Sequence, residues 1–445
     1  MIAELISVGT ELLLGNILNT NAQYLSRELA ELGVTVPRQS TIGDNPARLA
    51  EWVQSAKDRC DLLIFTGGLG PTADDLTKET VAACYSDTLT FDEEEWAKIA
   101  GFFARTGRTA TENNRKQAMV PVHGRKIPNS CGTAPGAWFE QNGKVAVLMP
   151  GVPREMKAMW TESVRPWLAG QTGCTLYSTT LHVLGGESAV ESAVAPLLEA
   201  ENPTAAIYCH TGECEIRITA RAASAQEGAA MCRASAKKFY EILGDAIYDE
   251  NAPGLEYTLV RTLQEKGLTL AAAESCTGGL IAQRITNVPG SSGVFGYGFV
   301  TYWEAAKVKL VGADPAVIEA YNVVSAPVAA QMALGAKQVA GADIAVAVTG
   351  VAGPTGGDEL RPVGTVYLAV AYGDQVQVLH LNISRSNREV VRQRAAGYAL
   401  ELAWRVAKGL PLFNCHALAA AQANDRAALD ALAQQCAAAQ PARRF

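Results

Sequence analysis

Short apolar runs that end in glycine-rich turns are the feature that most constrains the fold of this chain. Each run is typical of a buried strand, and the turns after runs 62–65 and 268–273 lead into helix-like segments. Strands that alternate with helices predict parallel sheets with helices on both faces. Sheets of this kind bind ligands beyond the carboxyl ends of their strands. The clearest examples are runs 62–65, 268–273 and 344–348, followed by turns 66–72, 274–279 and 349–357.

The length of the chain predicts several domains. A chain of 445 residues, 48% of them hydrophobic, exceeds what a single core usually holds. Mixed strand-like and helical stretches between residues 175 and 248 predict a small α+β domain between two α/β domains. Periodicity fades after residue 412, so alanine-rich 417–439 is expected to be a marginal helix or a tail with no core to bury. The expected boundaries are 1–170, 171–252, 253–410 and 411–445.

Composition favours a cytoplasmic protein. The first residues carry no basic leader, and no apolar run reaches the roughly 18 residues of a membrane span. The 10 cysteines are scattered, without a pair at zinc-ligand spacing. A net charge of -7 argues against a protein whose main role is to bind nucleic acid. We therefore expect neither a membrane partner nor direct nucleic-acid binding.

Ser275 lies on a tight turn between a predicted strand and a predicted helix. Gly278 and Gly279 follow it, so the backbone can approach a ligand closely, and free N–H groups of the helix start can hold an anion. The alternative is an ordinary helix start with Ser or Thr as its N-cap. Tyr302 and Lys307 follow near the ends of later elements. No histidine lies in these motifs, so a Ser-Lys arrangement is favoured over a Ser-His-Asp triad.

The glycine-rich turn at 66–72 predicts a phosphate site, because several backbone N–H groups can converge there. Asp74 and Asp75 follow it, and Glu11 follows another predicted strand. Such carboxylates suit a divalent cation that bridges a phosphate to protein. The alternative is that the two aspartates only cap the following helix.

The segment 1–165 resembles the molybdopterin-binding fold found at the N-terminus of CinA proteins. The motifs that carry the resemblance are Gly-Gly-Leu-Gly-Pro-Thr with Asp-Asp, Asn-Arg-Lys-Gln-Ala, Gly-Thr-Ala-Pro-Gly and Pro-Gly-Val-Pro-Arg-Glu-Met. The resemblance implies a metal-dependent ADP-ribose pyrophosphatase, in which Glu11, Asp74 and Asp75 hold the cation. The implied substrate-binding residues are Gly67, Gly68, Gly70, Thr72, Asn114, Lys116, Pro150 and Gly151. The alternative is a module that binds a pterin or a nucleotide without turnover.

Residues 255–408 resemble the CinA C-terminal domain, whose members include amidohydrolases of nicotinamide mononucleotide (NMN). The glycine-rich signatures at 274–279 and 349–357 carry this resemblance. It implies hydrolysis of NMN to nicotinate mononucleotide and ammonia, without a cofactor, in NAD by-product recycling. Ser275 would be the nucleophile, Lys307 the base, and Tyr302 the group that relays or orients the proton.

The same resemblance assigns the remaining roles in this α/β/α domain. Thr349 with the N–H groups of its glycine loop, or the N–H groups after Ser275, would hold the amide or its oxyanion. Arg388 would bind the 5′-phosphate, and Arg392, four residues on, shares its helix face. The implied substrate-binding positions are Cys276, Thr277, Gly278, Gly279, Gly350, Gly353 and Arg388.

The expected partners are small nucleotides, NMN and ADP-ribose, and we expect the chain to form a homodimer. A different class of function also stays open. The family name refers to competence, so the chain could instead be an interaction or regulatory protein. The acidic balance disfavours direct DNA binding in that case as well.

Overall fold

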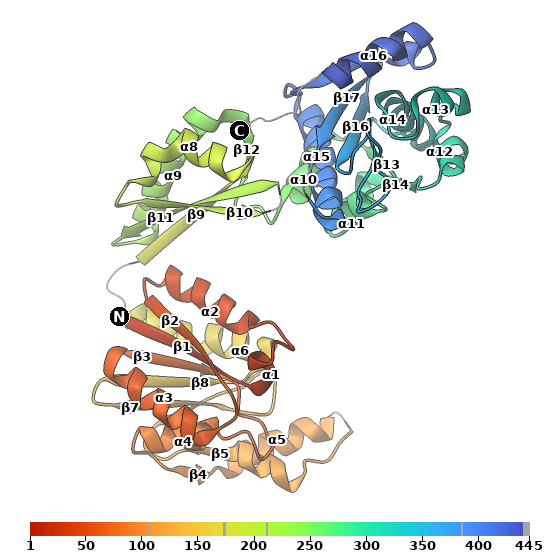
Figure 1. The fold of residues 1–445 in the computed structure, drawn as a ribbon. Helices are drawn as coiled ribbons and strands as arrows, with labels where there is room; N and C mark the ends of the chain where they lie inside the picture. The colour runs from red at the N-terminus through yellow and green to blue at the C-terminus, as the bar shows by residue number, and fades with distance from the viewer. Residues whose placement is uncertain (106, 172–174, 211, 384–385, 439–445) are drawn as a thin grey trace. The chain divides into compact units, whose positions relative to one another are not determined.

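The computed structural model describes residues 1–105, 107–171, 175–210, 212–383 and 386–438 (Figure 1). The chain forms two compact units, residues 1–178 with 219–232 and residues 179–218 with 233 onward. Each unit is considered by itself. No helix among the described residues is long and apolar enough to cross a membrane.

The N-terminal sheet has six strands in the order β2-β1-β3-β8-β7-β6. The four strands from β2 to β8 are parallel, and β7 and β6 are antiparallel additions. This confirms the parallel α/β sheet predicted from the buried run 62–65. The sheet strands are β1 Ile2–Val8, β2 Thr35–Ile42, β3 Leu62–Thr66, β6 Arg125–Ile127, β7 Gly136–Gln141 and β8 Lys144–Met149. A separate pair joins β4 Leu89–Phe91 to β5 Met119–Pro121.

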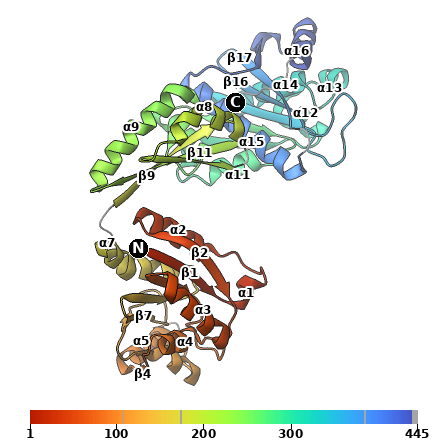
Figure 2. The same cartoon turned by 60° about the vertical axis from the view of Figure 1, so that its left-hand side comes forward.

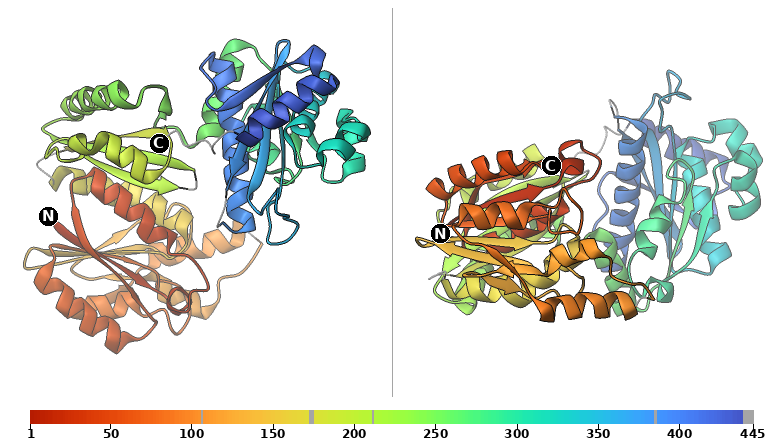
Figure 3. Two further views of the ribbon diagram at one scale, coloured as in Figure 1. Left: turned by 45° about the horizontal axis from the view of Figure 1, so that its top comes forward. Right: turned by 90° about the horizontal axis from the view of Figure 1, so that it is seen from below.

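Helices cover both faces of this sheet (Figure 3). One core contains Leu25 and Leu29 of α2 with Met156 of α6, and the other contains Val53 of α3 with Val81 of α4. Asn19 caps α2 by accepting the N–H of Ala22. The helices of this segment are α1 Thr10–Leu13, α2 Thr20–Glu31, α3 Pro46–Arg59, α4 Thr77–Cys84, α5 Glu93–Arg105, α6 Pro153–Met159 and α7 Arg165–Gln171, with a 3-10 turn at Glu112–Ala118 and a π turn at Trp160–Val164.

The middle segment contains strands and helices, as the sequence predicts. Its four strands form a sheet in the order β10-β11-β9-β12. The alternating burial along β11 places Glu215 and Arg217 on its half-buried face, opposite the buried Cys214 and Ile216. The elements are β9 Thr175–Leu184, α8 Glu187–Leu198, β10 Thr204–His210, β11 Glu213–Ala222, α9 Ala225–Leu243 and β12 Ile247–Glu250.

The C-terminal sheet has six strands in the order β14-β13-β15-β16-β17-β18 (Figures 1 and 2). The strands β14, β13 and β15 are parallel, and β16 to β18 are antiparallel. The strands are β13 Leu270–Glu274, β14 Phe295–Val300, β15 Ile344–Gly350, β16 Thr365–Tyr372, β17 Gln375–Asn382 and β18 Cys415–Ala419. The helices are α10 Leu255–Lys266, α11 Leu280–Thr286, α12 Glu304–Val311, α13 Pro315–Tyr321, α14 Ala326–Ala340, α15 Arg388–Lys408 and α16 Arg426–Ala438.

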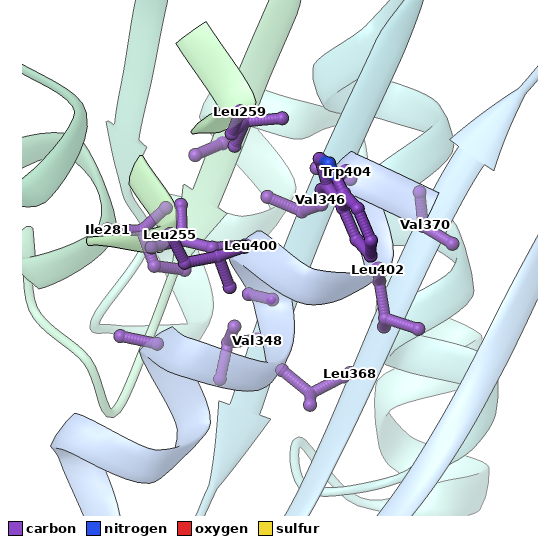
Figure 4. Close-up of a cluster of buried hydrophobic side chains, with 14 of the residues drawn as sticks. Leu255, Leu259, Ile281, Val346, Val348, Leu368, Val370, Leu400, Leu402 and Trp404 are labelled. Carbon is purple, nitrogen blue, oxygen red and sulfur yellow. The ribbon is translucent and has the colours of Figure 1, made fainter. Parts of the chain in front are cut away.

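The two faces of this sheet carry side chains of different size. Val346 and Val348 of β15 join Leu400 and Trp404 of α15 in one core (Figure 4). The other face presents alanines such as Ala347, against which the alanine-rich helix α14 packs. Successive side chains of a strand point to opposite faces of the sheet, so the valines and the alanines of one strand pack into different cores.

After residue 410, the alternative of a tail without a core is wrong for the described residues, whereas the alternative of a helix is confirmed by α16. The strand β18 pairs with β17 and extends the sheet. Helix α16 buries Leu429, Leu432 and Cys436 against the alanine face. Their spacing of three and four residues makes a narrow apolar stripe, which is enough because the face beneath it carries small side chains.

Candidate functional site

A cavity of about 500 Å³ lies where β13 and β15 end in the C-terminal sheet. The two strands are parallel neighbours in which Glu274 pairs with Val348, so the residues that follow them meet at one edge. All four side chains predicted for catalysis line this cavity, together with Arg388. The lining also includes the predicted positions Cys276, Gly350 and Gly353, whereas Thr277, Gly278 and Gly279 lie outside it.

Lys307 and Ser275 are in hydrogen-bond contact. The Lys307 Nζ lies 3.1 Å from Ser275 Oγ and donates to the Thr301 carbonyl at 2.8 Å. The Lys307 side chain is 1% exposed and forms no ion pair with any described carboxylate. Burial lowers the pKa of Lys307, although Cys276 and Glu304 act in the opposite direction. A neutral amine beside the serine hydroxyl is suited to accept its proton.

Cys276 is a weaker candidate nucleophile than Ser275. Burial raises the pKa of its thiol to about 12, although its own backbone N–H and the nearby Lys307, Arg392 and Arg388 side chains act in the opposite direction. The thiol therefore stays protonated at neutral pH, and a protonated thiol is a weak nucleophile.

Glu274 holds the turn after Ser275, a role that the sequence analysis missed. Its buried carboxylate accepts the backbone N–H groups of Gly279, Ile281 and Ala282 at 2.9–3.0 Å. The expectation that free N–H groups of this helix start hold an anion is therefore wrong, because the chain supplies the anion itself. The alternative of a Ser or Thr N-cap is also wrong, since Gly279 occupies that position without a side-chain bond. A carboxylate directly before the turn was the available signal.

Two backbone N–H groups lie beside the nucleophile. That of Thr277 has no acceptor among the described residues, and that of Cys276 contacts only its own thiol. The Thr349 hydroxyl, in contrast, donates to the Val323 carbonyl at 2.7 Å. A hydroxyl has one proton to donate, so Thr349 in this arrangement orients the loop. Of the two oxyanion sites that the sequence left open, the geometry favours the N–H groups after Ser275.

The two arginines of α15 have separate contacts. Arg388 donates to the Gly353 carbonyl at 2.8 Å and to the Tyr302 hydroxyl at 3.0 Å. Tyr302 thus accepts a bond and keeps its own proton for a group in the cavity. Arg392 donates to the Thr277 carbonyl at 2.8 Å and so supports the Ser275 turn. Asn387 caps the helix by accepting the N–H of Val390.

A second cavity, of about 510 Å³, lies in the N-terminal unit beyond β1, β3 and β8. The predicted metal residues Glu11, Asp74 and Asp75 line it. So do five of the predicted substrate-binding residues, Gly67, Gly68, Gly70, Pro150 and Gly151. Two further lining residues that the sequence analysis missed are Asn21 and Gln117.

A ligand can come close to the backbone of the glycine turn, because the turn has no room for side chains at Gly67 and Gly68. Gly67 and Gly68 have φ values of 102° and 67°, and a Cβ on Gly67 would lie 2.1 Å from the Val8 carbonyl oxygen. Across the cavity, Asn21 donates to the Gly151 carbonyl at 2.8 Å, while its buried Oδ1 has no described partner. An unpartnered buried oxygen in a cavity wall is suited to a ligand or ion.

Three residues predicted to bind the substrate form hydrogen bonds with other protein groups instead. Lys116 donates to the Thr72 and Asp75 carbonyls, and Asn114 accepts the Thr111 N–H at 2.9 Å. The Thr72 N–H and hydroxyl bond to the Asp75 carboxylate. None of Thr72, Asn114 and Lys116 lines the cavity. They fix the loops around it.

The carboxylates of this cavity do not form a complete metal site of their own. Among the described residues, no group of three His, Cys, Asp or Glu side chains could hold a metal ion. The alternative that Asp74 and Asp75 cap α4 is wrong, because Leu76 occupies the N-cap. Any ion here would need further ligands from a substrate or from water.

Comparison with known proteins identifies the family of this chain. The family model described as CinA C-terminal domain matches residues 253–407, and that described as probable molybdopterin binding domain matches residues 4–170. The model described as Damage-inducible protein CinA KH domain matches residues 178–248. A putative competence-damage inducible protein of Caldanaerobacter subterraneus subsp. tengcongensis is 44% identical over 410 residues, which cover 92% of this chain and 99% of that protein.

The chain belongs to the CinA family. This confirms the resemblance drawn from the motifs and the three-part fold, with a KH-like middle domain as the small α+β domain. A CinA-like protein of Synechococcus elongatus is 45% identical over 404 residues, covering 90% of this chain and 96% of the relative.

Solved CinA structures match a part of the chain. A CinA protein with unknown function from Thermoplasma acidophilum is 35% identical and covers 37% of this chain and 96% of its own, with a TM-score of 0.34. A competence/damage inducible protein from Agrobacterium tumefaciens is 40% identical over 34% of this chain and 94% of its own, with a TM-score of 0.32.

Proposed function

We propose that the C-terminal domain hydrolyses the carboxamide of NMN to nicotinate mononucleotide and ammonia. The observation that carries this proposal is the 3.1 Å contact between the buried Lys307 amine and the Ser275 hydroxyl at the wall of a cavity. Hydrolysis of an amide needs a nucleophile, a base and donors for the oxyanion, and the cavity supplies candidates for all three.

The reaction would proceed in two stages. Neutral Lys307 takes the Ser275 proton as Oγ attacks the carboxamide carbon, and the N–H groups of Cys276 and Thr277 stabilise the oxyanion. Collapse of the intermediate expels ammonia after proton return from Lys307, with Tyr302 orienting the transfer. Water then attacks the ester with the same base, which releases the carboxylate and regenerates the serine.

Arg388 would hold the 5′-phosphate. Its guanidinium lines the cavity, where it bonds to a carbonyl and a phenol but to no described carboxylate. Its charge is therefore not neutralised by an ion pair within the described chain. A guanidinium in this state is suited to bind a phosphate.

The pH dependence of ammonia release tests this function. Only neutral Lys307 can act as a base, so kcat/KM should rise about tenfold per pH unit until the pKa of Lys307 is reached. Because burial lowers that pKa, the plateau should begin below the ordinary lysine value of 10.5. The measurement is ammonia and nicotinate mononucleotide formed from NMN between about pH 6 and pH 10. A flat profile would contradict the role of Lys307, and absence of ammonia would contradict the function.

For the N-terminal domain, we infer a second activity, cleavage of the pyrophosphate of ADP-ribose. The glycine cradle at Gly67 and Gly68 supports this inference, together with the unpartnered oxygen of Asn21 in the same cavity. Glu11 and Asp74, with the pyrophosphate oxygens, would hold a divalent cation, since Mg²⁺ commonly uses one or two carboxylates plus substrate phosphates. When bound, such an ion neutralises charge on the phosphates.

Release of AMP from ADP-ribose tests this second activity. We expect turnover with Mg²⁺ or Mn²⁺, its loss on chelation, and its return when metal is added. The Asp74→Asn variant should be about a hundredfold slower, because it loses a negative ligand at an exposed position that the fold does not depend on. Binding of ADP-ribose without AMP release would instead establish a binding module.

A further inference from the structure

The indole of Trp303 lies open at the wall of the C-terminal cavity. Its side chain is 77% exposed, and it lines the same cavity as Ser275 and Lys307. No aromatic ring or cation among the described residues packs on it. Aromatic side chains usually bury most of their surface, so an open indole beside a reactive group is suited to contact a ligand.

The backbone of Trp303 is fixed although its ring is open. Its carbonyl accepts the N–H groups of Ala306 at 3.1 Å and Lys307 at 3.2 Å. Two residues earlier, the Thr301 N–H donates to the Glu274 carbonyl at 2.7 Å. The backbone of Trp303 is therefore held next to the helix turn that carries the base and close to the strand that precedes the nucleophile. The indole can reach a ligand that lies beside both groups.

The cavity is lined by a negative side chain on α12 and by a positive side chain on α15. Glu304 lines the cavity beside Trp303 and forms no ion pair with a described residue. Arg388, on α15, supplies the positive charge. A carboxylate and an indole face together attract a cation. A ligand that carries a cation close to its reacting carbonyl and an anion farther away matches this distribution.

We propose that Trp303 and Glu304 form a subsite for a cationic N-alkylpyridinium ring, which deepens the proposed amidase function and rests on it. In such a substrate the carboxamide is bonded directly to the ring, so the ring must lie beside Ser275 when the carbonyl is attacked. The indole face then stabilises the ring charge. A neutral dihydropyridine ring of the same shape loses this attraction. The subsite thus selects oxidised pyridinium amides over their reduced forms.

Ligand binding to an inactive background tests the subsite without the chemical step. The dissociation constants of NMN and its reduced dihydro form are measured by calorimetry on Ser275→Ala and on Ser275→Ala with Trp303→Ala. We expect the Kd of NMN to rise about tenfold and that of the dihydro form to change less than about twofold. Ser275→Ala with Trp303→Phe is the matched control, and it should retain most of the affinity for NMN. Glu304→Gln should also weaken NMN selectively.

Two results would overturn the subsite. Equal weakening of both ligands would show that Trp303 is only an apolar wall, and unchanged Kd values would show that the ring binds elsewhere. Ammonia release from NMN by the wild-type protein reports on the proposed function separately. If the wild-type protein releases ammonia but the Trp303 variants weaken both ligands equally, only the subsite is rejected. If the wild-type protein releases no ammonia, both the amidase function and the subsite are rejected. Since the indole is mostly exposed, its replacement should leave the fold intact.

Discussion

Replacement of Lys307 by methionine is expected to lower kcat for ammonia release from NMN by at least about 10³-fold. The amine is the only titratable group that the described structure places in hydrogen-bond contact with Ser275 Oγ. Without it, the hydroxyl keeps its proton and is a poor nucleophile. KM should change little, because Lys307 is assigned to proton transfer and Arg388 to binding of the phosphate.

The fold should survive this substitution. Lys307 is buried, and methionine fills a similar space without a charge to desolvate. The Thr301 carbonyl loses a donor, which costs about 1 kcal/mol in the free energy of unfolding. Lys309→Met, an exposed position on the same helix, is the matched control and should retain full activity. Activity retained in Lys307→Met would remove the lysine from the mechanism.

The sequence predicts the architecture of the C-terminal site because strands and turns have local signals. The apolar run before Ser275 and the glycines after it define a strand and a turn, and parallel pairing then brings Thr349 to the same edge. Local pattern also places Lys307 on the helix that follows β14. The local sequence pattern does not predict which hydrogen bonds the polar side chains form. Thr349 bonds to Val323, which lies far away in sequence.

Glu274 illustrates the same limit. Its position at the end of a predicted strand assigns it no role, and only the folded turn brings three N–H groups to its carboxylate. Likewise, Lys116 belongs to a recognisable motif but its amine turns toward backbone carbonyls. The direction of a long side chain depends on tertiary packing, which periodicity does not describe.

The sequence does not predict the packing of the C-terminal segment, because its signal is weak. Alanine contributes little to an apolar stripe, so Leu429 and Leu432 alone did not indicate a packed helix. The alanine face of the sheet, formed by residues such as Ala347, accepts such a thin layer. The contact depends on the fit between the narrow apolar stripe of α16 and the alanine face of the sheet. Neither of these two sequence patterns predicts the contact by itself.

The Ser275→Ala variant is predicted to release ammonia from NMN at least about 10³-fold more slowly than the wild type, because no hydroxyl remains for Lys307 to activate. Burial keeps the neighbouring Cys276 thiol protonated, so it cannot substitute. The variant removes one oxygen and should keep the fold and the affinity for NMN. Ser292→Ala, at an exposed position outside the cavity, is the matched control.

The most direct test of the central claim is ammonia release from NMN by the wild-type protein beside Ser275→Ala, with NMN binding measured on both. The account predicts turnover in the wild type, loss of turnover in the variant, and similar dissociation constants. Equal rates in the two proteins would contradict the assignment of Ser275. Absence of ammonia from the wild-type protein would contradict the proposed amidase itself.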